Sequence, residues 1–139
     1  MPQLPAQRPH PDSAVLTELS LSLPPVPSAS QVARRAVRDR FGAVLGRNTL
    51  ADLELVVSEL VTNAIDHGRG TIRLAIDHDG YELHGSVTDE GVGFDYETRT
   101  VEGHELRGRG LPIVDVLVTR WGIRQGSTHV WFDMTLIEP

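Results

Sequence analysis

The sequence predicts an α+β fold of two layers, with a mixed, largely antiparallel sheet covered on one face by about three helices. Two observations predict this fold. Short segments of alternating apolar and polar residues come in pairs joined by turn residues, which is typical of β-hairpins. Longer segments carry apolar residues three and four positions apart, which is typical of helices that cover a sheet with one side.

Length and composition limit the possible functions. The chain has 139 residues, and we expect residues 1–14 to form a flexible, proline-rich tail and residues 15–139 to form a single domain. The formal net charge of −6 does not suggest nucleic acid or a membrane surface as a direct partner. Cysteine is absent, which excludes disulfides and thiolate metal sites. With no signal peptide or membrane-spanning run in the sequence, a cytoplasmic location is expected.

The first half of the domain contains one strand pattern and two helix patterns. Residues 15–23 alternate well enough for a strand, which the following prolines interrupt. A serine-capped helix with an arginine-rich polar face is expected over residues 29–45. Thr49 is the candidate cap of a second helix that reaches about Asp66, and Gly68 suits the end of that helix.

The second half contains two hairpin patterns separated by a loop and a helix. Residues 71–77 and 81–89 are expected to pair as a hairpin across a tight turn. The glycine-rich, charged residues 90–110 predict a loop, and residues 111–121 predict a third helix. The rest of the chain predicts a second hairpin that turns near Gly126.

The second helix carries an unusual polar side. Its apolar stripe is expected to face the sheet and consists of Leu50, Leu53, Val57, Leu60, Val61 and Ala64. Glu59, Asn63 and Asp66 lie on the opposite side of the helix, which also carries Leu55 and Val56. This side fits either a solvated polar face or a group that holds a hard cation and aligns a nucleophile.

Two glycine motifs lie in the following loop. Asp89 ends a strand and is followed by Gly91 and Gly93, whose spacing allows a flat or anionic ligand to approach the backbone closely. An aspartate at this position can accept a hydrogen bond from an exocyclic amine, although a lone motif of this kind also fits an ordinary turn. Gly108 and Gly110 precede the third helix, where free amide groups can bind phosphate.

The absence of lysine excludes two nucleotide-binding classes. All 13 basic residues are arginine. A P-loop and the eukaryotic protein-kinase fold both need a lysine on the phosphates. A nucleotide site in this chain must therefore neutralise phosphate charge with backbone amides, arginine and a metal ion.

Together these motifs resemble a known family. ExxxN at 59–63, DxGxGF at 89–94 and GRGL at 108–111 follow in the order of the GHKL ATPases, which have the Bergerat fold. The TRWG segment at 119–122 and the final VWFDM strand add to the resemblance, which covers residues 15–137. The most similar branch is the anti-sigma factor/serine-protein kinase type found in actinobacteria, and a lysine-free, arginine-rich chain fits a high-GC genome.

The resemblance implies a role for each matching residue. Asn63 would bind the Mg²⁺ that bridges the ATP phosphates, and Glu59, the catalytic residue, would orient or deprotonate the attacking hydroxyl. Asp89 would accept a hydrogen bond from the adenine amino group. His67 is as close to a capping position as to a ligand contact. The remaining positions that would contact ATP, beneath a lid at 95–107, are Gly91, Gly93, Phe94, Gly108, Arg109, Gly110 and Leu111.

The resemblance also implies an activity and partners. A member of this branch would phosphorylate a serine of a STAS-domain anti-sigma-factor antagonist, would sequester a sigma factor, and would act as a homodimer. The alternative is a catalytically silent nucleotide-binding module that acts through protein binding only. A histidine-kinase catalytic domain is disfavoured, because the residues before the first strand leave no room for a phosphoacceptor helix hairpin. The other histidines show no metal-ligand spacing and are expected at the surface, namely His78, His84, His104 and His129.

Overall fold

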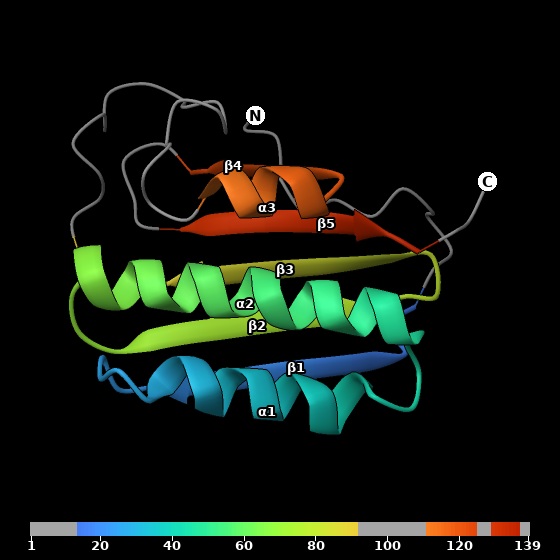
Figure 1. Ribbon diagram of the computed structural model, residues 1–139, viewed down its shortest axis with the longest axis horizontal. Coiled ribbons are helices and arrows are strands. Elements are labelled where there is room, and N and C mark those ends of the chain that lie inside the picture. The colour runs from blue at the N-terminus through green and yellow to red at the C-terminus, as the bar shows by residue number, and fades with distance from the viewer. Residues whose placement is uncertain (1–13, 92–110, 125–128, 137–139) are drawn as a thin grey trace.

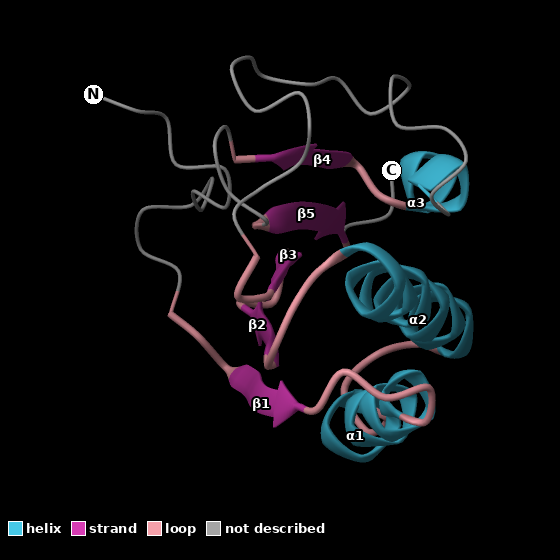
Figure 2. Cartoon of the chain, turned by 90° about the vertical axis from the view of Figure 1, so that its left-hand side faces the viewer, coloured by secondary structure: helices cyan, strands magenta, loops and turns pink. Residues whose placement is uncertain are grey.

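The computed structural model describes residues 14–91, 111–124 and 129–136 of the chain. These residues form a five-stranded sheet with the order β1-β2-β3-β5-β4 (Figure 1). Figure 2 shows that the helices all lie on one face of the sheet. In chain order the elements are β1 (Thr17–Leu23), α1 (Ala29–Phe41), α2 (Arg47–His67), β2 (Ile72–His78), β3 (Glu82–Thr88), α3 (Leu111–Leu117), β4 (Arg120–Ile123) and β5 (Val130–Thr135).

The predicted two-layer α+β fold is confirmed, with one refinement. We expected a mixed sheet, whereas every pair of neighbouring strands in the described residues is antiparallel. Each predicted hairpin lies within this pattern, because β2 pairs with β3 and β4 pairs with β5. None of the described helices is long and apolar enough to cross a membrane.

Strand alternation places the hydrophobic core between the sheet and the helices. On β2, Ile72, Leu74 and Ile76 are buried, while Arg73 and Ala75 between them are exposed. The predicted apolar stripe of α2 is buried except for Leu50, which is half-buried at the beginning of the helix. Burial of these large aliphatic side chains is the main force that holds the helical layer on the sheet.

Gly85 in the centre of β3 makes room for a fully buried aromatic side chain of the core. It pairs with Phe132 of β5, whose side chain is completely buried. A Cβ atom at residue 85 would overlap the Phe132 ring. The glycine is therefore required by close packing of a neighbouring side chain and not by backbone conformation.

The turn between β2 and β3 has the features of a tight hairpin. Asp79 Oδ1 accepts hydrogen bonds from the backbone N–H groups of Tyr81 and Glu82, both at 2.8 Å. Gly80 has φ of +92°, a conformation that glycine adopts at little cost. The sequence prediction of a tight turn between residues 77 and 81 is confirmed.

Some predicted helix boundaries are wrong. α1 ends at Phe41, four residues before the predicted end at 45. α2 begins at Arg47 with Gly46 at the cap position, so the predicted cap Thr49 lies inside the first turn. Serine and threonine are favoured caps only where their own backbone leaves the helix, and sequence alone does not fix that residue.

The end of the third helix was also misplaced. α3 ends at Leu117, and Trp121 lies in β4, where it pairs with Phe132. The backbone N–H of Thr119 donates to the carbonyl of Asp133 at 2.9 Å and begins the pairing with β5. The β-branched and aromatic residues of this segment fit a strand better than the end of a helix.

Candidate functional site

The last turns of α2 bring two of the predicted site residues to the edge of the core. Asn63 is 5% exposed and Glu59, one turn earlier, is half-buried. Asp66 and His67, in the last turn of the helix, are exposed. Among the described residues, Asn63 Oδ1 is a buried acceptor without a hydrogen-bond partner. Buried polar groups are normally paired, so this oxygen is able to bind a ligand, although His78 Nδ1 and His84 Nε2 are also buried without a hydrogen-bond partner among the described residues.

The arrangement of the helices explains why this side of α2 is available. α2 lies between α1 and α3 (Figure 1). Three side-chain contacts join α1 to one flank of α2, namely Ser30–Thr62 at 2.7 Å, Arg34–Ser58 at 2.8 Å and Arg38–Glu54 at 2.8 Å. At 100° per residue, Glu59 and Asn63 lie on the other flank, which faces α3. Glu59 and Asn63 are thus not fully solvated, and they are not the residues of α2 that contact α1.

Asp89 lies directly against the end of α2. Its Oδ1 accepts hydrogen bonds from the backbone N–H groups of Gly91 at 2.7 Å and Arg69 at 3.3 Å. A Cβ atom at Gly68 would overlap the Asp89 carboxylate and lie 2.7 Å from the carbonyl oxygen of Ala64. Gly68 has φ of −100°, so it is not a left-handed helix terminus of the usual glycine type. Its lack of a side chain lets Asp89 approach the helix that carries Asn63.

The structure brings some predicted site residues together and leaves others undescribed. Asp89 and Gly91 follow the end of β3, and Asp89 lies against the end of α2. Asn63 and Glu59 lie about one and two turns before that end of α2. Leu111 is completely buried at the start of α3, so its side chain belongs to the core. The predicted lid and five predicted ligand contacts fall outside the described residues, namely 95–107, Gly93, Phe94, Gly108, Arg109 and Gly110.

The residues that the structure describes fit a magnesium ion. Mg²⁺ prefers oxygen ligands and keeps several water molecules, so one protein oxygen beside substrate phosphates is a sufficient protein contribution. Asn63 Oδ1 is such an oxygen, since it is buried and accepts no hydrogen bond from the described part of the chain. Glu59, which makes no hydrogen bond or ion pair within the same residues, is one helical turn away.

An arginine follows β4 and a half-buried histidine precedes β5. Arg124 follows β4, and its backbone N–H donates to the carbonyl of His129 at 2.9 Å. Burial lowers the pKa of the half-buried His129 below its ordinary value, and the charge of Arg124 adds to this effect. Arg124 is therefore the positive charge of this pair at neutral pH.

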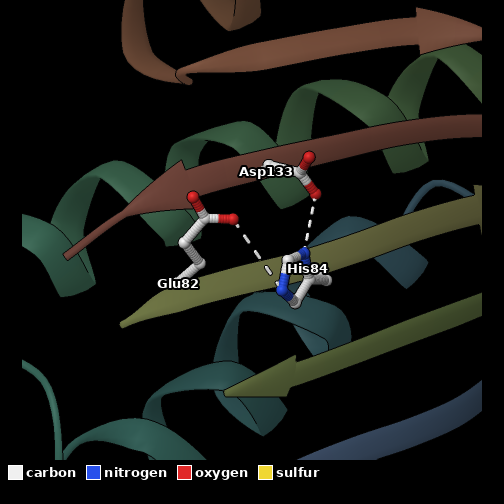
Figure 3. Close-up of side chains that lie close together, drawn as sticks. All are labelled: Glu82, His84 and Asp133. Carbon is white, nitrogen blue, oxygen red and sulfur yellow. Dashed lines mark hydrogen bonds and ion pairs between the residues drawn. The ribbon is translucent and has the colours of Figure 1, made fainter. Parts of the chain in front are cut away.

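A second polar cluster was missed in the sequence. Glu82, His84 and Asp133 are buried on the face of the sheet opposite the helices (Figure 3). His84 Nδ1 lies 2.8 Å from Asp133 Oδ1, and His84 Nε2 lies 3.8 Å from Glu82 Oε1 and 3.5 Å from Asp79 Oδ2. The expectation that His78 and His84 are surface residues is wrong, since they are 7% and 3% exposed.

The missed cluster has the donor set of a metal site but contains its own cation. One ligand atom from each of Glu82, His84 and Asp133 lies within 4.8 Å of the others. The Arg120 guanidinium lies between the carboxylates, with Nη2 3.0 Å from Asp133 Oδ2 and 3.2 Å from Glu82 Oε1. Because this guanidinium supplies the positive charge that a metal would supply, we interpret the cluster as an ion-pair network. The one sequence signal for this cluster was the alternation of residues on β3, which places Glu82 and His84 on the same face of the strand.

The network also shifts the pKa values of its members. Burial disfavours the His84 imidazolium, but the hydrogen bond and charge of Asp133, with the charges of Asp77 and Glu82, outweigh it and raise the pKa of His84. Burial likewise disfavours the charged Asp79 carboxylate. The backbone N–H donors of Glu82 and Tyr81 and the charge of His84 outweigh that effect, so the pKa of Asp79 is lowered. The network thus favours a charged histidine among charged carboxylates.

The comparison with known families bears on a five-stranded antiparallel sheet with helices on one face, and on Asp89 against the end of α2. A family model described as the histidine kinase-like ATPase domain matches residues 23–135. The match covers more than half of the chain, and the chain belongs to this family. The protein is therefore an ATPase domain of the GHKL type, and it binds ATP.

Proposed function

We propose that this protein belongs to the anti-sigma factor/serine-protein kinase branch and phosphorylates a serine of a STAS-domain anti-sigma-factor antagonist. The observation that carries the proposal is the pair Glu59 and Asn63 on one flank of α2. Asn63 is buried with an acceptor that no described residue satisfies, and Glu59 is half-buried without a partner among the same residues. A carboxylate and a metal-binding oxygen at this separation are what phosphoryl transfer requires.

Each residue has a defined role in the proposed reaction. Bound Mg²⁺ would neutralise charge on the ATP phosphates, and Asn63 Oδ1 would contribute to holding it. Glu59 would accept the proton of the attacking serine hydroxyl or orient that hydroxyl. Asp89 would accept a hydrogen bond from the adenine amino group through the carboxylate that Gly91 and Arg69 orient. By resemblance, Gly108, Arg109 and Gly110 would contact the phosphates.

The proposal includes regulation by partner exchange. As a homodimer, the protein would hold a sigma factor inactive, and phosphorylation of the antagonist would prevent the antagonist from releasing it. The support is the resemblance of the ordered motifs to that branch, together with membership of the histidine kinase-like ATPase domain family. Mg²⁺-dependent nucleotide binding would couple the two activities at one site.

A phosphotransfer assay tests the proposed reaction. Purified protein and Mg-ATP are mixed with STAS-domain proteins from the same organism, and intact mass is recorded for every component. We expect one partner to gain one phosphate. Glu59→Gln should lower the rate by about 10²–10⁴-fold while ATP binding persists, because a general base contributes about that factor. Glu54→Gln in the same helix is the matched control, since Glu54 contacts Arg38 and not the site.

Two results would count against the kinase. Normal phosphotransfer by Glu59→Gln would remove the base role from Glu59. Absence of phosphotransfer to every STAS protein, with ATP binding intact, would favour a nucleotide-binding module that acts through protein binding only.

A further inference from the structure

The loops that follow α2 and β3 are joined by a set of hydrogen bonds that centre on Glu90. The backbone N–H of Glu90 donates to the carbonyl of Arg69 at 2.7 Å. Its side-chain Oε1 accepts from the backbone N–H of Thr71 at 3.1 Å. Asp89 Oδ1 accepts from the N–H of Arg69 at 3.3 Å. Arg69 is therefore held at both its N–H and its carbonyl by the two residues that follow β3.

These bonds continue the pairing of β2 with β3 beyond the end of the sheet. The last paired residues are Arg73 and Thr88, and continuing the same register would place Thr71 opposite Glu90. There the Glu90 carboxylate takes the role of a backbone carbonyl and accepts the Thr71 N–H. Gly70 has φ of +70°, and a Cβ atom there would overlap the Glu90 side chain, so the loop fits closely around it.

The position of Asp89 relative to α2 depends on this connection. Arg69 and Gly68 follow directly from the end of α2, and the Asp89 carboxylate is in contact with both. Glu90 anchors the same loop from its other end at Thr71. Replacing the Glu90 side chain would remove its bond to Thr71 and keep the backbone bond from the Glu90 N–H to the Arg69 carbonyl. The loop that contacts the Asp89 carboxylate would then have fewer attachments to the residues that follow β3.

We propose that Glu90 is a positioning residue for adenine recognition, which holds Asp89 in register with the end of α2. The inference rests on the proposed role of Asp89 in accepting the adenine amino group. Glu90 itself is exposed and does not contact the base in this role. Its effect is on purine selectivity, because a displaced Asp89 would lose a hydrogen bond that adenine makes and guanine does not.

The test compares ATP and GTP binding in three proteins. Dissociation constants are measured by calorimetry with Mg²⁺ for the unmutated protein, Glu90→Ala and Glu90→Gln. We expect Glu90→Ala to lower the preference for ATP over GTP by about three- to tenfold, which is part of the contribution of one hydrogen bond to a carboxylate, because Asp89 is displaced and not removed. Glu90→Gln should retain the preference within about twofold, because its amide oxygen can accept the Thr71 N–H. The ratio cancels any change in repulsion of the phosphates, which both nucleotides share.

Measurements of thermal stability, with a control variant far from Glu90, distinguish a positioning role of Glu90 from a purely structural role. Thermal unfolding is measured for each protein without nucleotide, and Glu18→Ala on exposed β1 serves as a control for loss of a carboxylate. A lower melting temperature of Glu90→Ala with unchanged ATP preference would overturn the proposal. Equal binding of ATP and GTP by the unmutated protein would overturn it as well, because Asp89 would then not recognise adenine. Failure of the unmutated protein to bind ATP at all would instead refute the proposed function.

Discussion

The two ends of β3 carry buried polar groups of different kinds. At its beginning, Glu82 and His84 join Asp133 and Arg120 in a network whose charged groups lie 2.8–3.8 Å from oppositely charged partners. At its end, Asp89 lies against α2 near Asn63, whose Oδ1 has no hydrogen-bond partner among the described residues. The first group contains charges of both signs close together, although His84 Nε2 makes no hydrogen bond among the described residues. The second group has no such charge pair at Asn63.

The difference separates a structural role from a binding role. A buried charge without a partner costs several kcal/mol, so the network stabilises the fold only as a set. A buried acceptor without a partner lowers stability, and ligand binding is one explanation for its retention. Neither polar burial nor a missing hydrogen bond identifies the site alone, because His78 Nδ1 and His84 Nε2 are also buried without a hydrogen-bond partner among the described residues. The distinction of Asn63 is its position on α2, the helix against whose end Asp89 lies.

The largest expected effect comes from breaking the network at Asp133. Asp133→Ala leaves the buried His84 without its 2.8 Å partner and removes one of the two carboxylates that bind Arg120. We expect the free energy of unfolding to fall by about 3 kcal/mol or more, as for other buried pairs that lose one member. Chemical denaturation measures it, with Asp39→Ala on the exposed side of α1 as the control. A loss no larger than that of the control would show that the network does not stabilise the fold.

The second prediction is that a change at Asn63 weakens ATP binding and leaves stability nearly unchanged. Asn63→Leu keeps the side-chain volume and removes the unsatisfied carbonyl, so the free energy of unfolding should stay within about 1 kcal/mol of the unmutated value or rise. ATP affinity in the presence of Mg²⁺ should fall by about tenfold or more, because the metal loses its protein oxygen. Calorimetry with and without Mg²⁺ measures the affinity. Unchanged Mg²⁺-dependent binding would remove Asn63 from the site.

The smallest expected effect is a pH dependence of the stability that the Glu82–His84–Asp133–Arg120 network contributes through His84. The groups that face His84 are Asp77, Asp79, Glu82 and Asp133, and together they raise its pKa in the folded state. The stability that His84 contributes is therefore fully present below the unfolded pKa of about 6.5 and is lost as pH rises through the folded-state pKa.

Denaturation of His84→Gln and the unmutated protein between about pH 5.5 and about pH 9 tests this dependence. The stability difference should decrease as the pH rises. His67→Gln, at the exposed end of α2, is the control for replacing a histidine. A difference for His84→Gln that grows with pH would mean that the buried histidine is neutral in the folded protein.

Most of the fold could be predicted because its signals are local. Alternation on the strands and the apolar stripe of α2 follow from backbone geometry over a few residues. The predictions failed where the preferences for helix and strand were close in energy. Trp121 was predicted to end a helix, but it lies in β4 because it pairs with Phe132. The caps failed for a similar reason, because Gly46 and Thr49 both suit the start of a helix.

The site could be predicted in part. The spacing of Glu59 and Asn63 and the position of Asp89 after a strand indicated a nucleotide site, and the family match from 23 to 135 agrees with ATP as its ligand. The residues of the network could not be found in this way. His84 and Asp133 are 49 positions apart, and only the pairing of β3 with β5 places them side by side.

By itself, then, the sequence determined the two layers, the order of the motifs and the class of nucleotide site, because each depends on short-range periodicity and spacing. Only the tertiary structure decided which polar groups are satisfied. It buried His84 among carboxylates, left the acceptor of Asn63 without a partner among the described residues, and brought Asp89 against Gly68. The physical reason is that a hydrogen bond needs its two atoms within about 3 Å, and strand register and helix packing set that distance between residues far apart in the chain.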